Sequence, residues 1–271
     1  MTALSNPFPR WLWCLPLAGL AVTAPLWLHV REPAQFLAIN AFFLPVPGAI
    51  WAGLSLLGNG WGVLAVTAPL LVLSPRLMAA WLCAAPFAGL FARIGKEWID
   101  SPRPAALLHN EQMRTVGEVL YTASMPSGHT TTAFAWTAAI YLALTTAQKK
   151  RHSWLLLLAL AVGLSRIAVG AHWPGDVAVG ACLGLLSALL GNTLLATLRA
   201  QPWAALGWVS HGAKAMAGMA VAVAIYVLTT QTLDFAETLT LQHIVALWAA
   251  VSLLVLALRS ARSKLVADGG T

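Results

Sequence analysis

The stretch from Ser153 to Asp176 reads SWLLLLALAVGLSRIAVGAHWPGD, an apolar run that ends in a dense polar cluster. An α-helix rises about 1.5 Å per residue, so about 20 apolar residues cross the hydrocarbon layer of a bilayer. The apolar run at 153–171 comes close to that length. Pro174 suits the first turn of a following helix, where its missing N–H would have no partner. This stretch therefore predicts a membrane-spanning helix, a polar junction and the start of a second span.

The whole chain has the same apolar character. Its 271 residues are 59% hydrophobic and 9% charged, and the mean hydropathy is +0.75. These values lie far outside those of soluble globular domains, so we predict an all-α, polytopic membrane helix bundle. Glycines between residues 58 and 62 favour a break in the second span. Eight spans are expected, at about 11–30, 50–74, 76–95, 128–147, 153–171, 174–197, 213–230 and 242–258.

The net charge of +7 indicates membrane orientation rather than nucleic-acid binding, because the basic residues lie at the ends of the apolar runs. Short cytoplasmic loops carry an excess of Lys and Arg. With alternate loops facing inward, the inner set includes Lys149, Lys150 and Arg151 and the cations near both ends of the chain. This pattern predicts an integral membrane protein with both termini inside, and a bacterial inner membrane with cytoplasmic termini is the expected location. The polar junction at 165–176 then faces the periplasm or the cell exterior. In a eukaryotic cell the outer face would be lumenal or extracellular.

Three polar clusters interrupt the apolar sequence, and all of them fall on the expected outer side. They are Lys96–Pro104 (KEWIDSPRP), Pro126–His129 (PSGH) and Ser165–Asp176 (SRIAVGAHWPGD). The run from Gly128 to Thr146 and the return run from Ser153 to Ala171 have nearly equal length. His129 begins the first run and His172 follows the second, so helix rise alone places them at one depth. We therefore expect the two histidines to be neighbours.

The second and third clusters have residue types suited to holding an anion beside a histidine. Ser127 is a good N-cap, and Gly128 lets a ligand approach the backbone closely. Free N–H groups and the helix dipole make such a helix start an anion site. Asp176 lies four residues after His172. That spacing lets the carboxylate accept a hydrogen bond from one ring nitrogen while the other stays free to act.

Three cations accompany these residues, namely Lys96, Arg103 and Arg166. Arginine matches phosphate oxygens with a planar fork, and lysine acts as a mobile point charge. Charges gathered at one depth of a membrane protein indicate function. We expect a site for a phosphate ester with three positive charges.

The three cysteines lie inside expected spans without metal-ligand spacing, so they are expected to be core residues.

In its three polar clusters the chain resembles the type 2 phosphatidic acid phosphatase superfamily of membrane lipid phosphatases. The family signature has three parts: Lys, six residues, Arg-Pro; then Pro-Ser-Gly-His; then Ser-Arg, five residues, His, three residues, Asp. The chain matches them in order at Lys96–Pro104, Pro126–His129 and Ser165–Asp176. The resemblance covers about residues 30–198, and no signature position departs from the pattern.

The resemblance implies that His172 is the nucleophile, that Asp176 holds it, and that His129 is the general acid. It implies a metal-independent reaction without cofactors, and a core of six spans in residues 1–198. Residues 199–271 are then an extension of two spans and a cytoplasmic tail that the signature does not explain. A bell-shaped pH profile around the histidine range is expected. The residues that the resemblance assigns to phosphate binding are Lys96, Arg103, Ser127, Gly128 and Arg166.

The leading function is hydrolysis of a lipid phosphate or diphosphate at the outer face, with undecaprenyl diphosphate and phosphatidylglycerol phosphate as the favoured substrates. A lipid A phosphatase, or a phosphotransferase that passes the phosphoryl group to a second lipid, is an alternative. A lipid transporter without phosphatase activity is more distant, because the ionisable residues cluster at one surface. The expected partners are the lipid substrate and membrane lipids, with no nucleic acid. The oligomeric state stays open.

Two outer connections carry weaker signals. Residues 31–48 are expected to form an amphipathic surface helix anchored by Phe36, Phe42 and Phe43. Residues 105–125 have partly helical spacing from Met113 to Leu120, which indicates a short interfacial helix. That connection is either a plain connector or a lid that selects the substrate.

Overall fold

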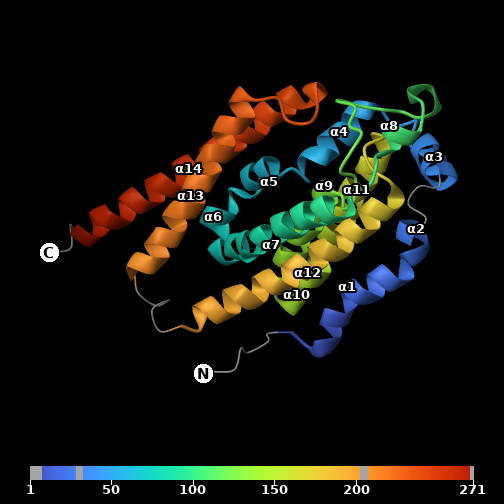
Figure 1. Ribbon diagram of the computed structural model, residues 1–271. Coiled ribbons are helices and arrows are strands. Elements are labelled where there is room, and N and C mark those ends of the chain that lie inside the picture. The colour runs from blue at the N-terminus through green and yellow to red at the C-terminus, as the bar shows by residue number, and fades with distance from the viewer. Residues whose placement is uncertain (1–7, 29–32, 202–206, 269–271) are drawn as a thin grey trace.

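Helices form all the regular structure of the described chain. The computed structural model describes residues 8–28, 33–201 and 207–268, and no strand occurs in these ranges. Four helices pack against one another at the centre of the molecule (Figure 1). The predicted all-α fold is confirmed. The central helices are α7 (Pro75–Ile99), α9 (Gly128–Ala143), α11 (Trp154–Ala168) and α12 (Pro174–Arg199).

Shorter helices surround this central group. Helices α1 (Arg10–Val22) and α2 (Ala24–Leu28) lie along α12, and α3 (Pro33–Phe42) and α4 (Gly48–Leu56) contact α11 (Figure 1). The side chain of Asn192 on α12 donates to the carbonyl of Ala139 on α9 at 3.1 Å, which joins two of the central helices. The other elements that precede the central group are α5 (Gly60–Thr67) and α6 (Leu70–Leu73).

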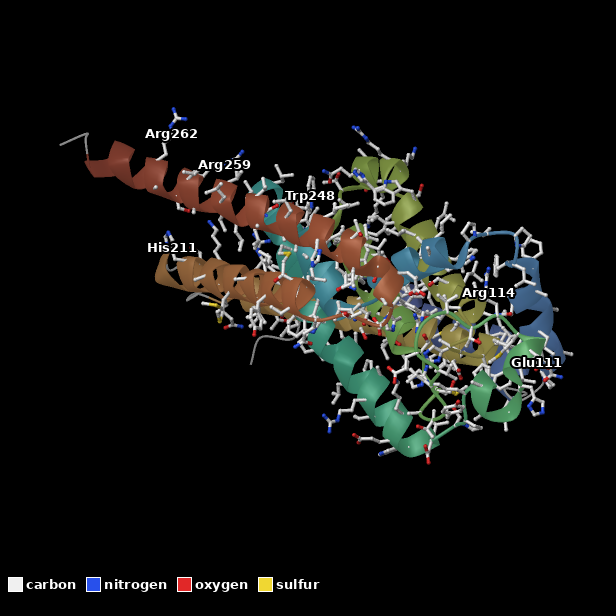
Figure 2. All side chains as sticks on the ribbon, turned by 90° about the horizontal axis from the view of Figure 1, so that it is seen from above. Glu111, Arg114, His211, Trp248, Arg259 and Arg262 are labelled. Atoms are coloured by element: carbon white, nitrogen blue, oxygen red, sulfur yellow. The ribbon has the colours of Figure 1, made fainter. Side chains whose placement is uncertain are left out.

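A pair of long helices forms the C-terminal part of the described chain. The two helices pack against each other and against α5, and Figure 2 shows them reaching away from the rest of the bundle. They are α13 (Gly207–Thr230) and α14 (Leu239–Asp268), joined by a turn that contains η3 (Ala236–Thr238). The remaining elements are α8 (Pro104–Leu107), η1 (Asn110–Gln112) and α10 (Thr146–Arg151). The expected boundary of the extension at residue 199 stays a prediction.

Among the described residues, four helical stretches are long and apolar enough to cross a membrane: Pro75–Leu107, Pro174–Arg199, Ser210–Thr230 and Ala236–Arg262. The expected second span is broken as the glycines predicted, with an angle of 73° between α4 and α5. The four long stretches correspond to the spans expected at about 76–95, 174–197, 213–230 and 242–258. The spans expected at 11–30, 128–147 and 153–171 instead form helices of 13, 16 and 15 residues.

Local capping and proline signals account for the shorter helices. Thr145 is the N-cap residue of α10, and its hydroxyl accepts a hydrogen bond from the N–H of Gln148. The preceding helix, α9, ends at Ala143. Pro25 lacks the N–H that would continue α1, which ends at Val22. An apolar run does not reveal where its helices end, because mean hydropathy is averaged over the whole run and capping residues and prolines contribute little to it.

The polar clusters lie together at one end of the central helices. The carboxyl ends of α7 and α11 meet the amino ends of α9 and α12 there. The basic helix α10 lies at the opposite end of α9 (Figure 1). In the long helix pair, Figure 2 places Arg259 and Arg262 far from Arg114 and Glu111. The clusters and the basic segments thus occupy opposite ends of the molecule.

The segment expected as a surface helix contributes to the core instead. In α3, Phe36 is fully buried and meets the ring of Trp173 edge to face, with 5.3 Å between the ring centroids. Phe42 of the same helix is 76% exposed. One face of α3 therefore supports the junction between α11 and α12. Residues 29–32, which belong to the expected first span and surface helix, lie outside the described residues.

The interfacial helix expected near Met113–Leu120 does not form. Arg114 holds this segment in an irregular path, because its backbone N–H donates to the side chain of Asn40 at 2.8 Å. Its guanidinium also donates to the carbonyl of Val46 at 2.7 Å. These bonds tie the 105–125 connection to the segments around α3 and use the N–H of Arg114 outside any local helix.

Candidate active site

His172 lies in the junction between α11 and α12, with 2% of its side chain exposed. Its Nδ1 is 3.2 Å from Oδ2 of Asp176, in the first turn of α12. Its Nε2 is 3.4 Å from Nη1 of Arg103. Arginine can only donate, so Nε2 is the accepting nitrogen and the ring proton lies on Nδ1, directed at Asp176. This tautomer leaves a lone pair on Nε2.

The surroundings of His172 favour the neutral ring. Burial lowers its pKa well below the ordinary histidine value, and the positive charges of Arg103, Arg166 and Lys96 lower it further. His129 adds a smaller effect in the same direction. The neutral imidazole, which can attack an electrophile, is therefore the stable form at neutral pH.

Asp176 is fully buried and is held by three donors. Its Oδ2 accepts hydrogen bonds from the hydroxyl of Ser124, from the N–H of Trp173 at 2.9 Å and from the ring of His172. Trp173 is the N-cap residue of α12, and Pro174 takes the first turn as the sequence predicted. The carboxylate therefore caps a helix and holds the histidine, which fixes the ring relative to α12.

Arg103 is clamped by backbone carbonyls beside this histidine. It is 5% exposed. Its Nε donates to the carbonyl of Thr122 at 2.8 Å, and its Nη1 donates to the carbonyl of Ala171 at 3.0 Å. Its own N–H donates to the carbonyl of Tyr121. A fork fixed in this way needs little reorganisation to stabilise negative charge that develops near His172.

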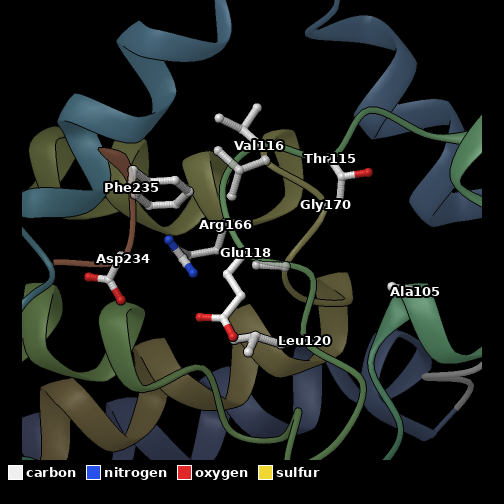
Figure 3. Close-up of a pocket in the computed structure, with 11 residues that line it drawn as sticks. Ala105, Thr115, Val116, Glu118, Leu120, Arg166, Gly170, Asp234 and Phe235 are labelled. Carbon is white, nitrogen blue, oxygen red and sulfur yellow. The ribbon is translucent and has the colours of Figure 1, made fainter. Parts of the chain in front are cut away.

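Arg166 projects from the last turn of α11 into a small pocket of about 50 Å³ (Figure 3). Its Nη1 donates to the hydroxyl of Ser55 on α4 at 2.9 Å, and Ser55 lies 3.0 Å from the hydroxyl of Ser165. The Nε of Arg166 is buried with no hydrogen-bond partner among the described residues. An unpaired buried donor is unfavourable, and an oxygen of a bound phosphate would satisfy it.

The start of α9 has the geometry expected of an anion site. Ser127 caps the helix, and its Oγ accepts hydrogen bonds from the N–H and the hydroxyl of Thr130 at 3.4 and 2.9 Å. Both bonds use Ser127 as acceptor, so its own proton can still be donated to a ligand. A Cβ placed on Gly128 would come no closer than 4.0 Å to Ala92. There is therefore space beside the first N–H groups of the helix.

Lys96 lies half-buried in the last turn of α7. It interacts electrostatically with Arg103, Arg166 and Asp176. His129, in the first turn of α9, interacts in the same way with Arg166 and Lys96. The structure thus brings together all the residues singled out in the sequence, namely Lys96, Arg103, Ser127, Gly128, His129, Arg166, His172 and Asp176. Their roles remain proposals.

The sequence interpretation missed a carboxylate at this site. Oδ2 of Asp234 lies 3.1 Å from Nε2 of His129, although the two residues are 105 positions apart. Asp234 belongs to the turn between α13 and α14, which the charge pattern places on the same outer side as the three clusters. That shared side is the signal that could have indicated it. Other polar contacts that no sequence signal indicated are made by Ser55, Asn59 and Ser124.

Parts of the chain are similar to a protein family and to individual known proteins. Residues 76–200 match the family model of the PAP2 superfamily. A stretch of 67 residues is 51% identical to the bacitracin transport permease protein BcrC of Bacillus licheniformis, covering 24% of this chain and 30% of that protein. The chain thus matches less than a third of that relative's length. The crystal structure of Aquifex aeolicus LpxE superposes with a TM-score of 0.52 and 25% identity, over 58% of this chain and 92% of that chain.

The matched family region contains every predicted site residue from Lys96 to Asp176, and it excludes Asp234. The three ordered motifs fall within it, and so do the four central helices apart from Pro75, the first residue of α7. Residues 76–200 of this chain are thus similar to the PAP2 superfamily.

Proposed function

We propose that this protein is a membrane phosphatase that hydrolyses a lipid phosphate or diphosphate through a phosphohistidine intermediate. The observation that carries the proposal is the lone pair on Nε2 of His172, facing Arg103, with its Nδ1 proton directed at Asp176. A buried, neutral and oriented imidazole surrounded by cations is suited to attack on phosphorus. The PAP2 superfamily match and the likeness to LpxE support this chemistry.

In the first step, Nε2 of His172 forms a bond to phosphorus, and the bond from phosphorus to the leaving oxygen breaks. His129 donates a proton to that oxygen, which leaves as an alcohol or as a lipid monophosphate. The resulting imidazolium of His172 is stabilised by Asp176. Arg103, Arg166, Lys96 and the start of α9 stabilise the charge on the equatorial oxygens.

In the second step, water attacks the phosphohistidine. His129, now neutral, takes a proton from the water as the new P–O bond forms. The P–N bond to His172 breaks, and inorganic phosphate leaves. The chain's own residues supply each proton transfer and the positive charge, so we propose that the reaction needs no metal ion.

For the substrate we propose undecaprenyl diphosphate or phosphatidylglycerol phosphate, hydrolysed at the periplasmic or extracellular face of the membrane. The site lies at the end of the helices opposite the basic helix α10, which supports that orientation under the positive-inside rule. A lipid A phosphate is an alternative substrate. Transfer of the phosphoryl group to a second lipid, in place of water, would use the same first step.

Transport is a second candidate function, favoured by the name of the relative BcrC, a bacitracin transport permease protein. The oriented histidine pair favours hydrolysis, since binding a headgroup for transport needs cations but no nucleophile. Movement of labelled lipid between leaflets of vesicles without phosphate release would identify a transporter.

The test is a phosphate-release assay on the purified protein in detergent. Undecaprenyl diphosphate, phosphatidylglycerol phosphate and lipid A would be compared, with His172→Ala as the inactive variant. We expect phosphate release from at least one lipid, abolished by the substitution. Each phosphate released should be matched by one lipid molecule that has lost one phosphate. Accumulation of a newly phosphorylated second lipid would show transfer, and turnover by His172→Ala near the wild-type rate would refute the mechanism.

A further inference from the structure

The turn between α13 and α14 reaches the proposed active site, although it lies outside the matched family region. Oδ2 of Asp234 accepts a hydrogen bond from the side-chain amide of Asn59 at 2.9 Å and lies 3.1 Å from Nε2 of His129. The ring of Phe235, the next residue, faces the guanidinium of Arg166 at 5.4 Å. Figure 3 shows Asp234 and Phe235 on one side of the pocket, with Arg166 beside them. One turn therefore contacts both His129, the proposed general acid, and Arg166, a residue proposed to bind phosphate.

The Asp234 carboxylate is held in place from a third element. Asn59 is the N-cap of α5, and its Oδ1 accepts a hydrogen bond from the N–H of Trp61 at 3.0 Å. Because the amide oxygen is used in this way, the amide nitrogen is directed at Asp234. A helix cap thus fixes Asn59, Asn59 fixes Asp234, and Asp234 contacts His129.

Close packing keeps the turn against the site. A Cβ on Gly58 would lie 2.8 Å from the carbonyl oxygen of His129, so only glycine lets the start of α5 approach α9 so closely. A Cβ on Gly117 would lie 2.5 Å from the ring of Phe235. The turn is also fixed from behind, where the buried side chain of Gln242 donates to Thr238 at 2.9 Å. The turn is therefore packed into the structure and does not approach the site as an unsupported surface loop.

The position of the carboxylate also has a conformational cost. Asp234 has a φ of 35°, in the left-handed region that most L-residues avoid. Residues held in such conformations cluster at functional sites, where surrounding contacts over-determine them. Burial opposes ionisation of Asp234, but the hydrogen bonds from His129 and Asn59 and the charge of Arg166 outweigh it, so its pKa lies well below the ordinary value. The side chain is therefore an anion at neutral pH.

We infer that the C-terminal helix pair completes the active site, and that Asp234 is a positioning residue that orients His129 and favours its protonated form. This inference rests on the proposed function of His129 as general acid. Burial and the cations Arg166 and Lys96 lower the pKa of His129, whereas the hydrogen bond and the charge of Asp234 raise it. The histidine pair would then have two carboxylates, one local and one supplied by α13 and α14.

The test compares Asp234→Asn with Glu237→Gln, a substitution that removes the same charge from an exposed residue three positions away. For a lipid phosphate, Asp234→Asn should lower kcat about tenfold with little change in KM, because an opposite charge at this distance typically shifts a titration by about one unit or more. The alkaline limb of the pH profile should move to lower pH. Glu237→Gln should behave as wild type.

A substrate that needs no acid separates positioning from a merely structural role. Nitrophenolate leaves without protonation, so the same Asp234→Asn variant should hydrolyse p-nitrophenyl phosphate at a rate within about twofold of wild type. Equal losses on both substrates would overturn the inference. A faster Asp234→Asn enzyme would overturn it too, since the carboxylate would then obstruct phosphate binding.

A measurement without turnover distinguishes this inference from the proposed function. NMR titration of labelled histidines, assigned with His129→Ala, should show that Asp234→Asn lowers the midpoint of His129 by about one unit. An unchanged midpoint would refute the coupling even in an active phosphatase. If the wild type releases no phosphate from any lipid, the proposed function fails, and the titration still decides whether Asp234 acts on His129.

Discussion

The two histidines of the site differ in where their carboxylates come from. Asp176 lies four residues after His172 on the same helix start, and the two side chains are 0% and 2% exposed. Asp234 lies 105 residues after His129 in the turn between α13 and α14, and these side chains are 31% and 18% exposed. The nucleophile thus has a local, dry partner, whereas the proposed acid has a distant partner that solvent reaches.

The two histidine–carboxylate pairs also differ in how strongly solvent screens them and in whether both residues lie in the matched family region. Solvent hardly screens an interaction between buried groups, whereas it weakens an interaction between partly exposed ones. The His172–Asp176 pair falls inside the matched family region, and Asp234 falls outside it. We therefore expect the local pair to be essential and the distant carboxylate to tune the rate.

The largest expected effect is that of His172→Ala, which removes the nucleophile. The rate of phosphate release should fall by about 10⁴-fold or more, because deletion of the catalytic nucleophile has effects of this size in other enzymes. His152→Ala, at the other end of the molecule beside α10, serves as the control and should keep the wild-type rate. A His172→Ala enzyme that keeps a tenth of the activity would remove His172 from the reaction.

The next effect in size concerns the local carboxylate. Asp176→Asn keeps a side chain that can cap α12, but its amide favours the wrong tautomer of His172. We expect kcat to fall by about 10³- to 10⁴-fold, with normal elution of the protein in size-exclusion chromatography. A loss smaller than that caused by Asp234→Asn would reverse the comparison between the two carboxylates.

The distant carboxylate should have a smaller effect, of about tenfold for Asp234→Asn. A double-mutant cycle sharpens the comparison. Because Asp234 is inferred to act through His129, the substitution should cost less than about twofold in a His129→Ala background. The cycle is measured on a lipid phosphate under saturating conditions. Full additivity of the two losses would mean that Asp234 acts elsewhere.

The pH profile probes the same contrast. Because burial and nearby cations lower the pKa of His172, its ring stays neutral as pH falls through the ordinary histidine range. Activity should therefore be lost only at lower pH, when that depressed pKa is reached. Arg103→Gln removes a positive charge beside the ring and should move the acid limb upward by about one unit. An acid limb that stays in place would mean that another group controls it.

The smallest expected effect is that of metal removal. The proposed reaction uses Lys96, Arg103 and Arg166 where other phosphatases use metal ions. Dialysis against EDTA should leave the phosphate-release rate unchanged within error, with added Mg²⁺ as the matched control. A rate that collapses with EDTA and returns with Mg²⁺ would require a revised mechanism.

The sequence predicted the parts of the site that depend on short spacing. Asp176 follows His172 by one helical turn, and Ser127 directly precedes α9, so both could be placed from local geometry. The equal lengths of two apolar runs placed His129 near His172. Each of these inferences needs only helix rise and capping chemistry.

The sequence could not supply contacts that depend on packing between distant helices. Asp234 reaches His129 because α13 and α14 pack along α5, and nothing in the apolar pattern of these helices specifies that neighbour. Ser55 reaches Arg166 across the interface of α4 and α11 for the same reason. The helix expected near Met113 failed because Arg114 found partners in the segments around α3, which a helical spacing pattern cannot include.

The central claim, that His172 carries the phosphoryl group, can be tested most directly by trapping the intermediate. A lipid substrate with a radiolabelled terminal phosphate would be mixed with the enzyme and quenched in alkali, where phosphohistidine survives. We predict label on the peptide that contains His172 in the wild type and none in His172→Ala. Rapid turnover with no label on that peptide, or label on His129 instead, would contradict the account.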